Sequence, residues 1–297
     1  MRPVRALGLY LAVVFLGGAL LAPWLYWLAG TAAQEFPKLA HAPFHRFVNR
    51  SMLALALAGL WPLLRALGAG SWRHLGLIRP AGRWRQWFGG FLLGFLSLAT
   101  VAGIAVAAGG RNLIPHPDAG PIFMKMLAAA LTAVTVAVME EILFRGGIFG
   151  GLRRVLDWRF ALTLSSMIYA MVHFFARTQD PQTVTWTSGF HQLGLMLGGF
   201  ADWQQIIPGF FSLTLAGLLL GLAYQRTGDL YFSIGLHAGW IFWVKSYAIL
   251  TARAASAHPW FWGTEKMTDS WLALAVLTLT LAVFTRLPAG RSRRPIA

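Results

Sequence analysis

Two adjacent carboxylates are the first candidates for chemistry, because they lie within an apolar stretch. Glu140 and Glu141 fall inside the segment from Ile122 to Phe149, whereas the other acidic residues lie in loops or near the ends of apolar segments. An ionisable side chain within a membrane helix costs about 2.5–3.5 kcal/mol, so a pair of them indicates a function. Arg145 follows Glu141 at i+4, on the same helix face, and we expect these two residues to form an ion pair. Glu140 is rotated by about 100° from Glu141, lacks so well placed a cation, and suits a general base or acid.

Two histidines also lie within apolar segments: His173 between Phe160 and Phe175, and His237 between Leu230 and Leu250. An intramembrane histidine by itself is more often a hydrogen-bonding residue between helices than a catalyst. Its coincidence with a glutamate pair favours a joint site, because Glu and His are the usual proton-transfer residues of enzymes. We therefore expect Glu140, His173 and His237 to line one polar cavity.

The elements that position these residues are membrane helices. The chain has 297 residues, of which 57% are hydrophobic and 12% are charged. Soluble globular proteins have about 25% charged residues, so this composition excludes a disordered chain and an ordinary cytosolic enzyme. The chain has no cysteine, which excludes thiol chemistry and disulfides.

Segments of suitable length and hydropathy predict the fold. A membrane-spanning helix needs about 20 mostly apolar residues. The first candidate is longer than the usual apolar region of a cleaved signal peptide, so we expect a retained helix, although the small residues that follow it, such as Gly30 and Ala32, also fit a cleavage site. We predict an all-α polytopic membrane protein, a bundle of about eight transmembrane helices. The candidate segments cover residues 7–28, 52–67, 87–108, 122–149, 160–175, 206–224, 230–250 and 271–284. Glycine pairs at four-residue spacing, such as Gly90 with Gly94 and Gly235 with Gly239, predict close helix crossings.

The basic residues predict the orientation. The net charge is +15, but the Lys and Arg residues alternate with apolar segments, so we expect no nucleic-acid partner. With both termini in the cytoplasm, 16 of the 25 basic residues lie inside, in agreement with the positive-inside rule. The nine outside are Lys38, Arg46, Arg50, Arg111, Lys125, Arg177, Lys245, Arg253 and Lys266. The excess of Arg over Lys points to a bacterial source and hence to the inner membrane. The stretch from Ser71 to Gln86 mixes Arg and Trp, which fits either an interfacial segment or a solvated loop.

Three motifs resemble those of a known family. The run from Glu140 to Arg145 is similar to the EExxFR signature of the CAAX-protease and bacteriocin-processing (CPBP) intramembrane proteases, which include the CAAX prenyl-protein endopeptidases. Tyr169 to His173 is similar to the second motif, FxxxH, with Tyr in place of Phe. His237 matches the third motif, HxxxN, and Ile241 stands where Asn is common. The resemblance divides the chain into N-terminal transmembrane helices with the interfacial segment, a CPBP-like catalytic core, and a C-terminal helix with a basic tail: residues 1–119, 120–250 and 251–297.

The resemblance implies an intramembrane endopeptidase. Its substrate would be a membrane-associated protein or peptide, including a prenylated one, cut near its C-terminus. Glu140 and His173 would activate the hydrolytic water, Glu141 and Arg145 would brace the site, and His237 would stabilise the oxyanion. The missing Asn at position 241 removes half of the oxyanion hole that the resemblance implies.

Metal dependence and activity both leave alternatives open. Glutamate and histidine are zinc ligands, but the same residues can run a metal-free reaction with Glu as the base, which we favour. Ile241 is also compatible with a non-catalytic CPBP-type scaffold or immunity protein that binds a partner. Glu and His inside a bundle can also form the proton relay of a transporter. Transporters often have two related halves, and the glutamate pair has no counterpart elsewhere in the chain.

Overall fold

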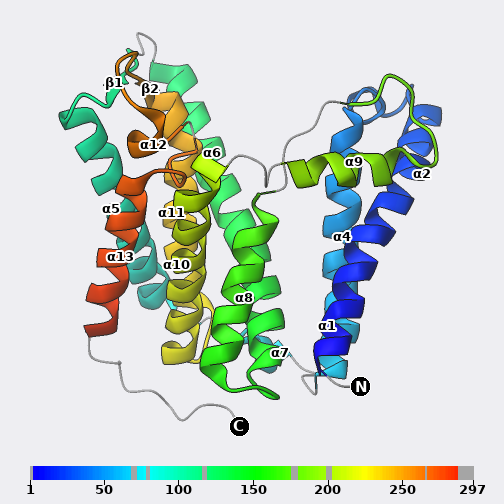
Figure 1. Ribbon diagram of the computed structural model, residues 1–297, viewed down its shortest axis with the longest axis horizontal. Helices are drawn as coiled ribbons and strands as arrows, with labels where there is room; N and C mark the ends of the chain where they lie inside the picture. Colours follow the sequence, from blue (N-terminus) through cyan, green and yellow to red (C-terminus); the bar gives the residue numbers. More distant parts are fainter. Residues whose placement is uncertain are drawn as a thin grey trace. The chain divides into compact units, whose positions relative to one another are not determined.

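The computed structural model shows a helical protein with a short two-stranded sheet (Figure 1). It describes residues 3–67, 72–77, 81–115, 119–174, 180–198, 203–264 and 266–286. The predicted basic tail, with Arg291, Arg293 and Arg294, lies outside these ranges, as do Ser71 and residues 78–80 of the predicted interfacial segment. The chain forms two compact units, residues 1–70 with 172–202 and residues 71–171 with 203–297, so the predicted core at 120–250 contributes to both.

The first unit is a small helical bundle. Its elements are α1 (Pro3–Ala12), the π-helix η1 (Val13–Gly17), α2 (Gly18–Thr31), α3 (Pro37–Ala40), α4 (Phe44–Ala66) and α9 (Ser188–Met196). The Tyr10 hydroxyl of α1 donates to the carbonyl of Ala56 in α4 at 2.9 Å. Asp180 accepts a hydrogen bond of 2.7 Å from the backbone N–H of His45, one of the N–H groups in the first turn of α4 that have no partner within the helix. These contacts connect segments that are distant in sequence into one unit.

The second unit holds the predicted catalytic glutamates. Its helices are η2 (Trp72–Leu75), α5 (Trp84–Ala107), α6 (Ala119–Glu140), the π-helix η3 (Glu141–Phe149), α7 (Gly150–Leu152), α8 (Trp158–Val172), α10 (Trp203–Thr227), α11 (Tyr231–Leu250), α12 (Pro259–Trp262) and α13 (Trp271–Arg286). Strands β1 (Arg111–Leu113) and β2 (Thr251–Arg253) pair antiparallel. The apolar core lies among α5, α10, α11 and α13, and includes Leu98, Leu220, Leu236 and Leu277.

Each predicted apolar segment coincides with a helix in the structure. Five helical stretches among the described residues are long and apolar enough to cross a membrane: Arg5–Thr31, Phe44–Ala66, Trp84–Ala107, Gly120–Leu152 and Ile206–Thr227. One boundary was wrong, because α4 begins at Phe44 and not near Met52. Its first turns carry His45, Arg46 and Arg50, whose polarity masks the helix in a hydropathy window.

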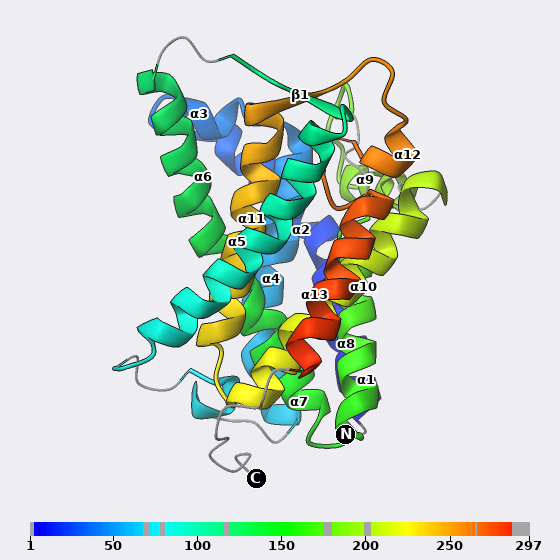
Figure 2. The same cartoon turned by 90° about the vertical axis from the view of Figure 1, so that its left-hand side faces the viewer.

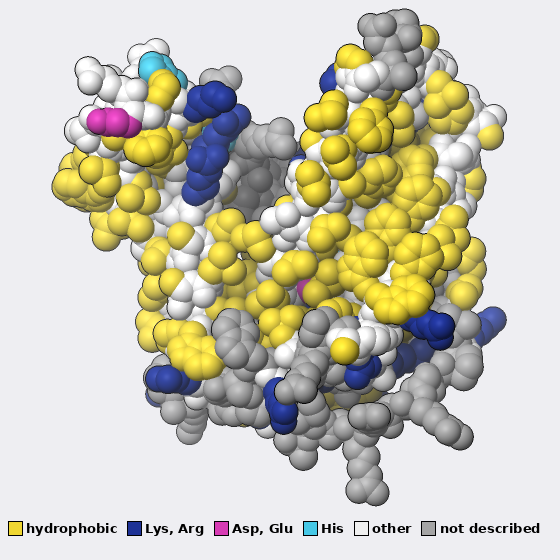
Figure 3. All heavy atoms as spheres, turned by 180° about the vertical axis from the view of Figure 1, so that it is seen from behind, with side chains coloured by type: hydrophobic (Ala, Val, Ile, Leu, Met, Phe, Trp, Pro, Cys, Tyr) yellow, Lys and Arg dark blue, Asp and Glu magenta, His cyan; other side chains and the backbone are white. Residues whose placement is uncertain are grey.

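The surface of the second unit fits a lipid environment. Figure 3, which draws the whole protein, shows large patches of hydrophobic side chains, with Lys and Arg side chains along the lower edge and in a group in the upper part. Large exposed apolar residues include Phe88 and Leu92 of α5 and Phe123 and Leu131 of α6. Apolar cover of this extent is unusual for a soluble protein. The chain is therefore an integral membrane protein with a polytopic helical fold.

Glycines bring α5 and α11 into backbone contact, as their four-residue spacing predicts (Figure 2). A Cβ atom added at Gly90 or Gly94 would clash with carbonyl oxygens of α11, and one added at Gly235 would clash with the carbonyl oxygen of Trp87 in α5. Both α5 and α11 therefore need glycine where they cross. Because His237 lies between Gly235 and Gly239, this crossing fixes its depth and direction.

Polar contacts hold the ends of the helices in the second unit. Arg226, near the end of α10, donates to the carbonyl oxygens of Phe284 and Thr285 at the end of α13, at 2.5 and 2.8 Å. Arg83, directly before α5, forms an ion pair of 2.9 Å with the buried carboxylate of Asp229, in the turn before α11. Burial raises the pKa of Asp229 above its usual value, although the Tyr231 N–H and Arg83 oppose the shift.

Candidate active site

The glutamate pair lies where an α-helix changes to a π-helix. α6 ends at Glu140, and η3 begins at Glu141 and continues to Phe149. A π-helix has i→i+5 hydrogen bonds, is rare, and is frequently found at functional sites. Glu141 and Arg145 lie in this π-helix, and their side chains are 0% and 3% exposed. Gly146 lies on the same stretch, and a Cβ atom there would come within 2.7 Å of the carbonyl oxygen of Leu75, so η3 also packs closely against η2.

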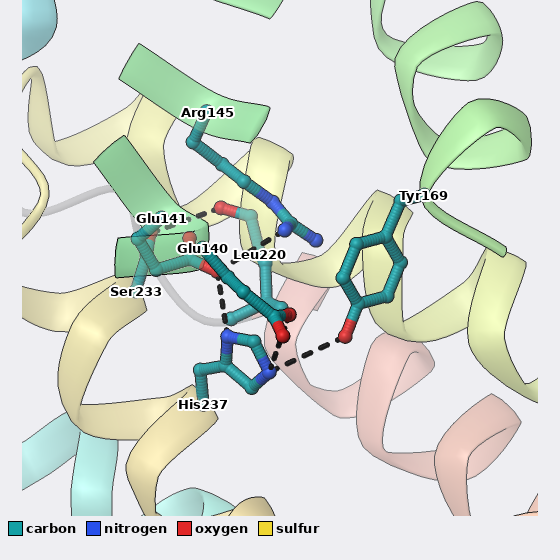
Figure 4. A network of polar contacts seen from close by, with 7 residues as sticks. All are labelled: Glu140, Glu141, Arg145, Tyr169, Leu220, Ser233 and His237. Atoms are coloured by element: carbon teal, nitrogen blue, oxygen red, sulfur yellow. Dashed lines mark hydrogen bonds and ion pairs between the residues drawn. The ribbon is translucent and has the colours of Figure 1, made fainter. Parts of the chain in front are cut away.

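Glu141 connects a cation and a histidine (Figure 4). Its Oε1 atom lies 3.1 Å from Nη1 of Arg145, so the ion pair expected from the i,i+4 spacing is present. The same oxygen lies 2.8 Å from Nδ1 of His237 on α11. Because an ionised carboxylate only accepts hydrogen bonds, Nδ1 carries a proton and donates it to Glu141. Glu141 thereby fixes the orientation of the imidazole, and Arg145 balances its charge.

Glu140 faces the other ring nitrogen of His237. Its Oε2 atom lies 3.7 Å from Nε2, and its side chain is 26% exposed, against 0% for Glu141. With a proton on both ring nitrogens, the group would contain two carboxylates, one guanidinium and one imidazolium, and would be electrically balanced. Buried charges are tolerated when they are paired in this way. Glu140 is the more accessible of the two carboxylates and so the better placed to meet a water molecule.

Tyr169 joins this group from α8, a contact that the sequence did not predict. Its hydroxyl lies 3.3 Å from Nε2 of His237, and the residue is 3% exposed. The Arg145 guanidinium lies over its ring at 4.4 Å from the centroid, and the ring of Phe144 meets it edge-on at 5.1 Å. The signal was available in the second motif, where Tyr takes the place of Phe and adds one polar atom.

The described contacts join four of the five predicted site residues: Glu140, Glu141, Arg145 and His237. His173 lies in the turn directly after α8, one helical turn beyond Tyr169, with an exposed side chain. It is where the chain leaves the second unit and enters the first. Its part in the site stays a prediction.

The described residues offer fewer ligands than a catalytic zinc ion usually has. Catalytic zinc usually has three protein ligands and a water molecule. Among the described residues, no group of three or more His, Asp or Glu side chains is arranged to hold a metal ion. Glu140 Oε2 and His237 Nε2 could supply two ligands, whereas Glu141 Oε1 is already shared by Arg145 and His237. The described residues therefore provide two of the three protein ligands that a catalytic zinc usually has.

A comparison with known families supports the family resemblance of the motifs. Residues 122–243 match the family model described as type II CAAX prenyl endopeptidase, Rce1-like. The segment belongs to the CAAX protease family. The matched residues run from the start of α6 to the middle of α11 and include all the polar residues shown in Figure 4. No curated protein and no solved structure matches the chain.

Proposed function

We propose that this protein is an intramembrane endopeptidase of the CAAX type. It would hydrolyse a peptide bond near the C-terminus of a membrane-associated substrate, including a prenylated one. The observation that carries the proposal is the linked set of the buried Glu141, Arg145 and His237 with the partly exposed Glu140, in a segment that matches the family model. Such a cluster is expensive inside a membrane protein and is explained by chemistry rather than by stability.

The arrangement supports a water-activation mechanism. Glu140, together with His173, would take a proton from water while the water oxygen attacks the carbonyl carbon of the scissile bond. The electron pair of the C=O bond would move onto the carbonyl oxygen, where the N–H group at Nε2 of His237 would stabilise the charge. As the C–N bond breaks, Glu140 would return its proton to the leaving amine. Glu141 and Arg145 hold the imidazole in place and do not exchange protons with the substrate.

The proposal includes an orientation in the membrane. Eight helices cross the bilayer, both termini lie in the cytoplasm, and the protein resides in the inner membrane of a bacterium. The lipid bilayer and a membrane-bound peptide are its partners, and no nucleic acid is involved. The pairing of β1 with β2 supports this topology, because it joins two loops that the topology assigns to the same outer side.

Cleavage by purified protein tests the activity. The probes are a farnesylated peptide with a CAAX terminus and the same peptide without the farnesyl group. Glu140→Gln should abolish cleavage with little change in thermal stability, because glutamine keeps the shape of the side chain but cannot accept a proton from water. Glu35→Gln, at an exposed glutamate of the first unit, is the matched control and should cleave like the unmodified protein. Cleavage by Glu140→Gln at the normal rate would contradict the assigned base.

A chelator series tests the metal-free reaction. Dialysis against 1,10-phenanthroline or EDTA should leave the cleavage rate unchanged if the protein groups suffice. A loss of activity that returns with zinc, and with no other divalent ion, would overturn the metal-free proposal and leave the endopeptidase proposal intact.

Ile241 favours a second candidate function. It lies one turn after His237 on α11, where the resemblance leads us to expect an amide side chain. A protein with an incomplete oxyanion hole could still bind a peptide without cutting it. Saturable binding of the farnesylated peptide with no product at any enzyme concentration would favour this non-catalytic role.

A further inference from the structure

Two departures from the family motifs meet beside the same histidine. Tyr169 stands in place of Phe in the second motif, and Ile241 stands in place of Asn in the third. The first change adds a hydroxyl, and the second removes an amide. Tyr169 contacts His237 directly, and Ile241 lies four residues after it on α11. Thus α11 lacks the amide that the motif has at position 241, whereas α8 adds the hydroxyl of Tyr169.

The ring of Tyr169 is held by contacts that do not need its hydroxyl. The Arg145 guanidinium lies 4.4 Å from the ring centroid, and the ring of Phe144 packs against it at 5.1 Å with an interplanar angle of 87°. These contacts would hold a phenylalanine equally well. The hydroxyl is therefore directed at His237 by the ring and is not itself required for packing (Figure 4).

The hydroxyl and Nε2 of His237 are 3.3 Å apart, a separation that suits two donors acting on one oxygen atom. Donors that stabilise an oxyanion lie about 2.7–3.1 Å from it, and two atoms at this separation can both meet that condition. The Nδ1 proton is held by Glu141 at 2.8 Å, so an imidazolium would direct its second proton, on Nε2, toward the same region as the hydroxyl.

We propose that the Tyr169 hydroxyl is the second oxyanion donor of this protein and replaces the amide that the motif has at position 241. This proposal rests on the proposed endopeptidase function. When the attacking water oxygen bonds to the carbonyl carbon, the C=O electron pair moves to the oxygen, which accepts hydrogen bonds from Oη of Tyr169 and Nε2 of His237. The hydroxyl keeps its proton throughout, so no further co-reactant is needed.

A swap of the two positions tests the proposal with the farnesylated CAAX peptide as probe. Tyr169→Phe should lower kcat by about 10²-fold, as expected for the loss of one oxyanion donor, with KM and the melting temperature unchanged. Ile241→Asn alone should change kcat little, because the donor position is already filled. The double variant Tyr169→Phe/Ile241→Asn should regain most of the lost kcat, since it restores the family's own pair of residues.

Tyr224→Phe is the matched control, because Tyr224 is also buried and also lies under a guanidinium, that of Arg153 at 4.5 Å. It should leave kcat unchanged. An unchanged kcat in Tyr169→Phe, in an enzyme that Glu140→Gln inactivates, would overturn the donor role and leave the endopeptidase function standing. A lowered melting temperature without rescue by Ile241→Asn would also overturn it, because Tyr169 would then be structural. If the unmodified protein cleaves no probe, the endopeptidase function and the donor role fail together.

Discussion

At the scale of single residues, the central feature is the carboxylate of Glu141, which contacts two partners and is not exposed to solvent. Glu141 is 0% exposed and contacts Arg145 at 3.1 Å and His237 at 2.8 Å. Removing one member of a buried ion pair leaves the other charge stranded in a medium of low dielectric constant. The two neighbouring glutamates should therefore differ sharply in their effect on stability.

Glu141→Gln should lower the stability of the protein by about 3–5 kcal/mol, the usual cost of breaking a buried ion pair. Thermal unfolding in detergent measures the effect, and Glu140→Gln, which leaves the pair with Arg145 intact, should melt near the unmodified protein. The double variant Glu141→Gln/Arg145→Met should recover part of the loss, because it leaves no stranded guanidinium. Equal melting temperatures for the single and double variants would show that the stranded charge is not the cause.

The sequence predicted the ion pair within one helix and the proximity of Glu140 and His237, but not the contacts of His237 with Glu141 and Tyr169. The pairing of Glu141 with Arg145 follows from i,i+4 spacing alone. The contacts of His237 with Glu141 and Tyr169 depend on the rotation of three helices about their axes. Hydropathy does not report that rotation, so the hydroxyl of Tyr169 could be noticed as a motif change but not placed.

At the scale of elements, the crossing of α5 and α11 positions His237. Gly94 of α5 lies against the backbone of Leu236, the residue directly before His237. Gly103, on the same helix, has nothing within 4 Å of the position that a Cβ atom would take. The chain thus offers two glycines in one helix that differ only in their neighbours.

Gly94→Ala should force the two helices apart, lower the melting temperature and reduce cleavage, because His237 would move away from Glu141. Gly103→Ala should leave both measurements unchanged or raise stability slightly, since alanine is the better helix former. Melting curves and cleavage rates of the two variants, measured side by side, check this prediction. Equal behaviour of the two variants would contradict the close crossing.

The elements themselves were largely predictable, but their irregularities were not. A spanning helix needs about 20 apolar residues, a strong signal that located every predicted segment on a helix. The π-helical winding of η3 left no such signal, because the apolar pattern of its residues fits an α-helix equally well. The pairing of β1 with β2 joins residues 111–113 to 251–253, and three-residue strands are too short to show alternation.

At the scale of the whole molecule, the proposed topology can be tested directly because the chain contains no cysteine. Val155, between α7 and α8, and Gln182, before α9, are both exposed. A membrane-impermeant maleimide should label Gln182→Cys in intact cells and Val155→Cys only after the membrane is opened. This follows from placing the basic turn with Arg153 and Arg154 in the cytoplasm. Labelling of Val155→Cys in intact cells would show that the protein has the opposite orientation in the membrane.

The hydrogen bonds from Arg226 to the end of α13 have a consequence for the order in which the helices can assemble during synthesis. α13 is the last described helix to be synthesised, and the carbonyl groups that Arg226 binds, those of Phe284 and Thr285, are at its very end. During translation, α10 and α11 are therefore complete well before the acceptors for Arg226 leave the ribosome. We expect chains truncated before Phe284 to be degraded more rapidly than chains that include it, because they lack the two carbonyl groups that Arg226 binds at the end of α13.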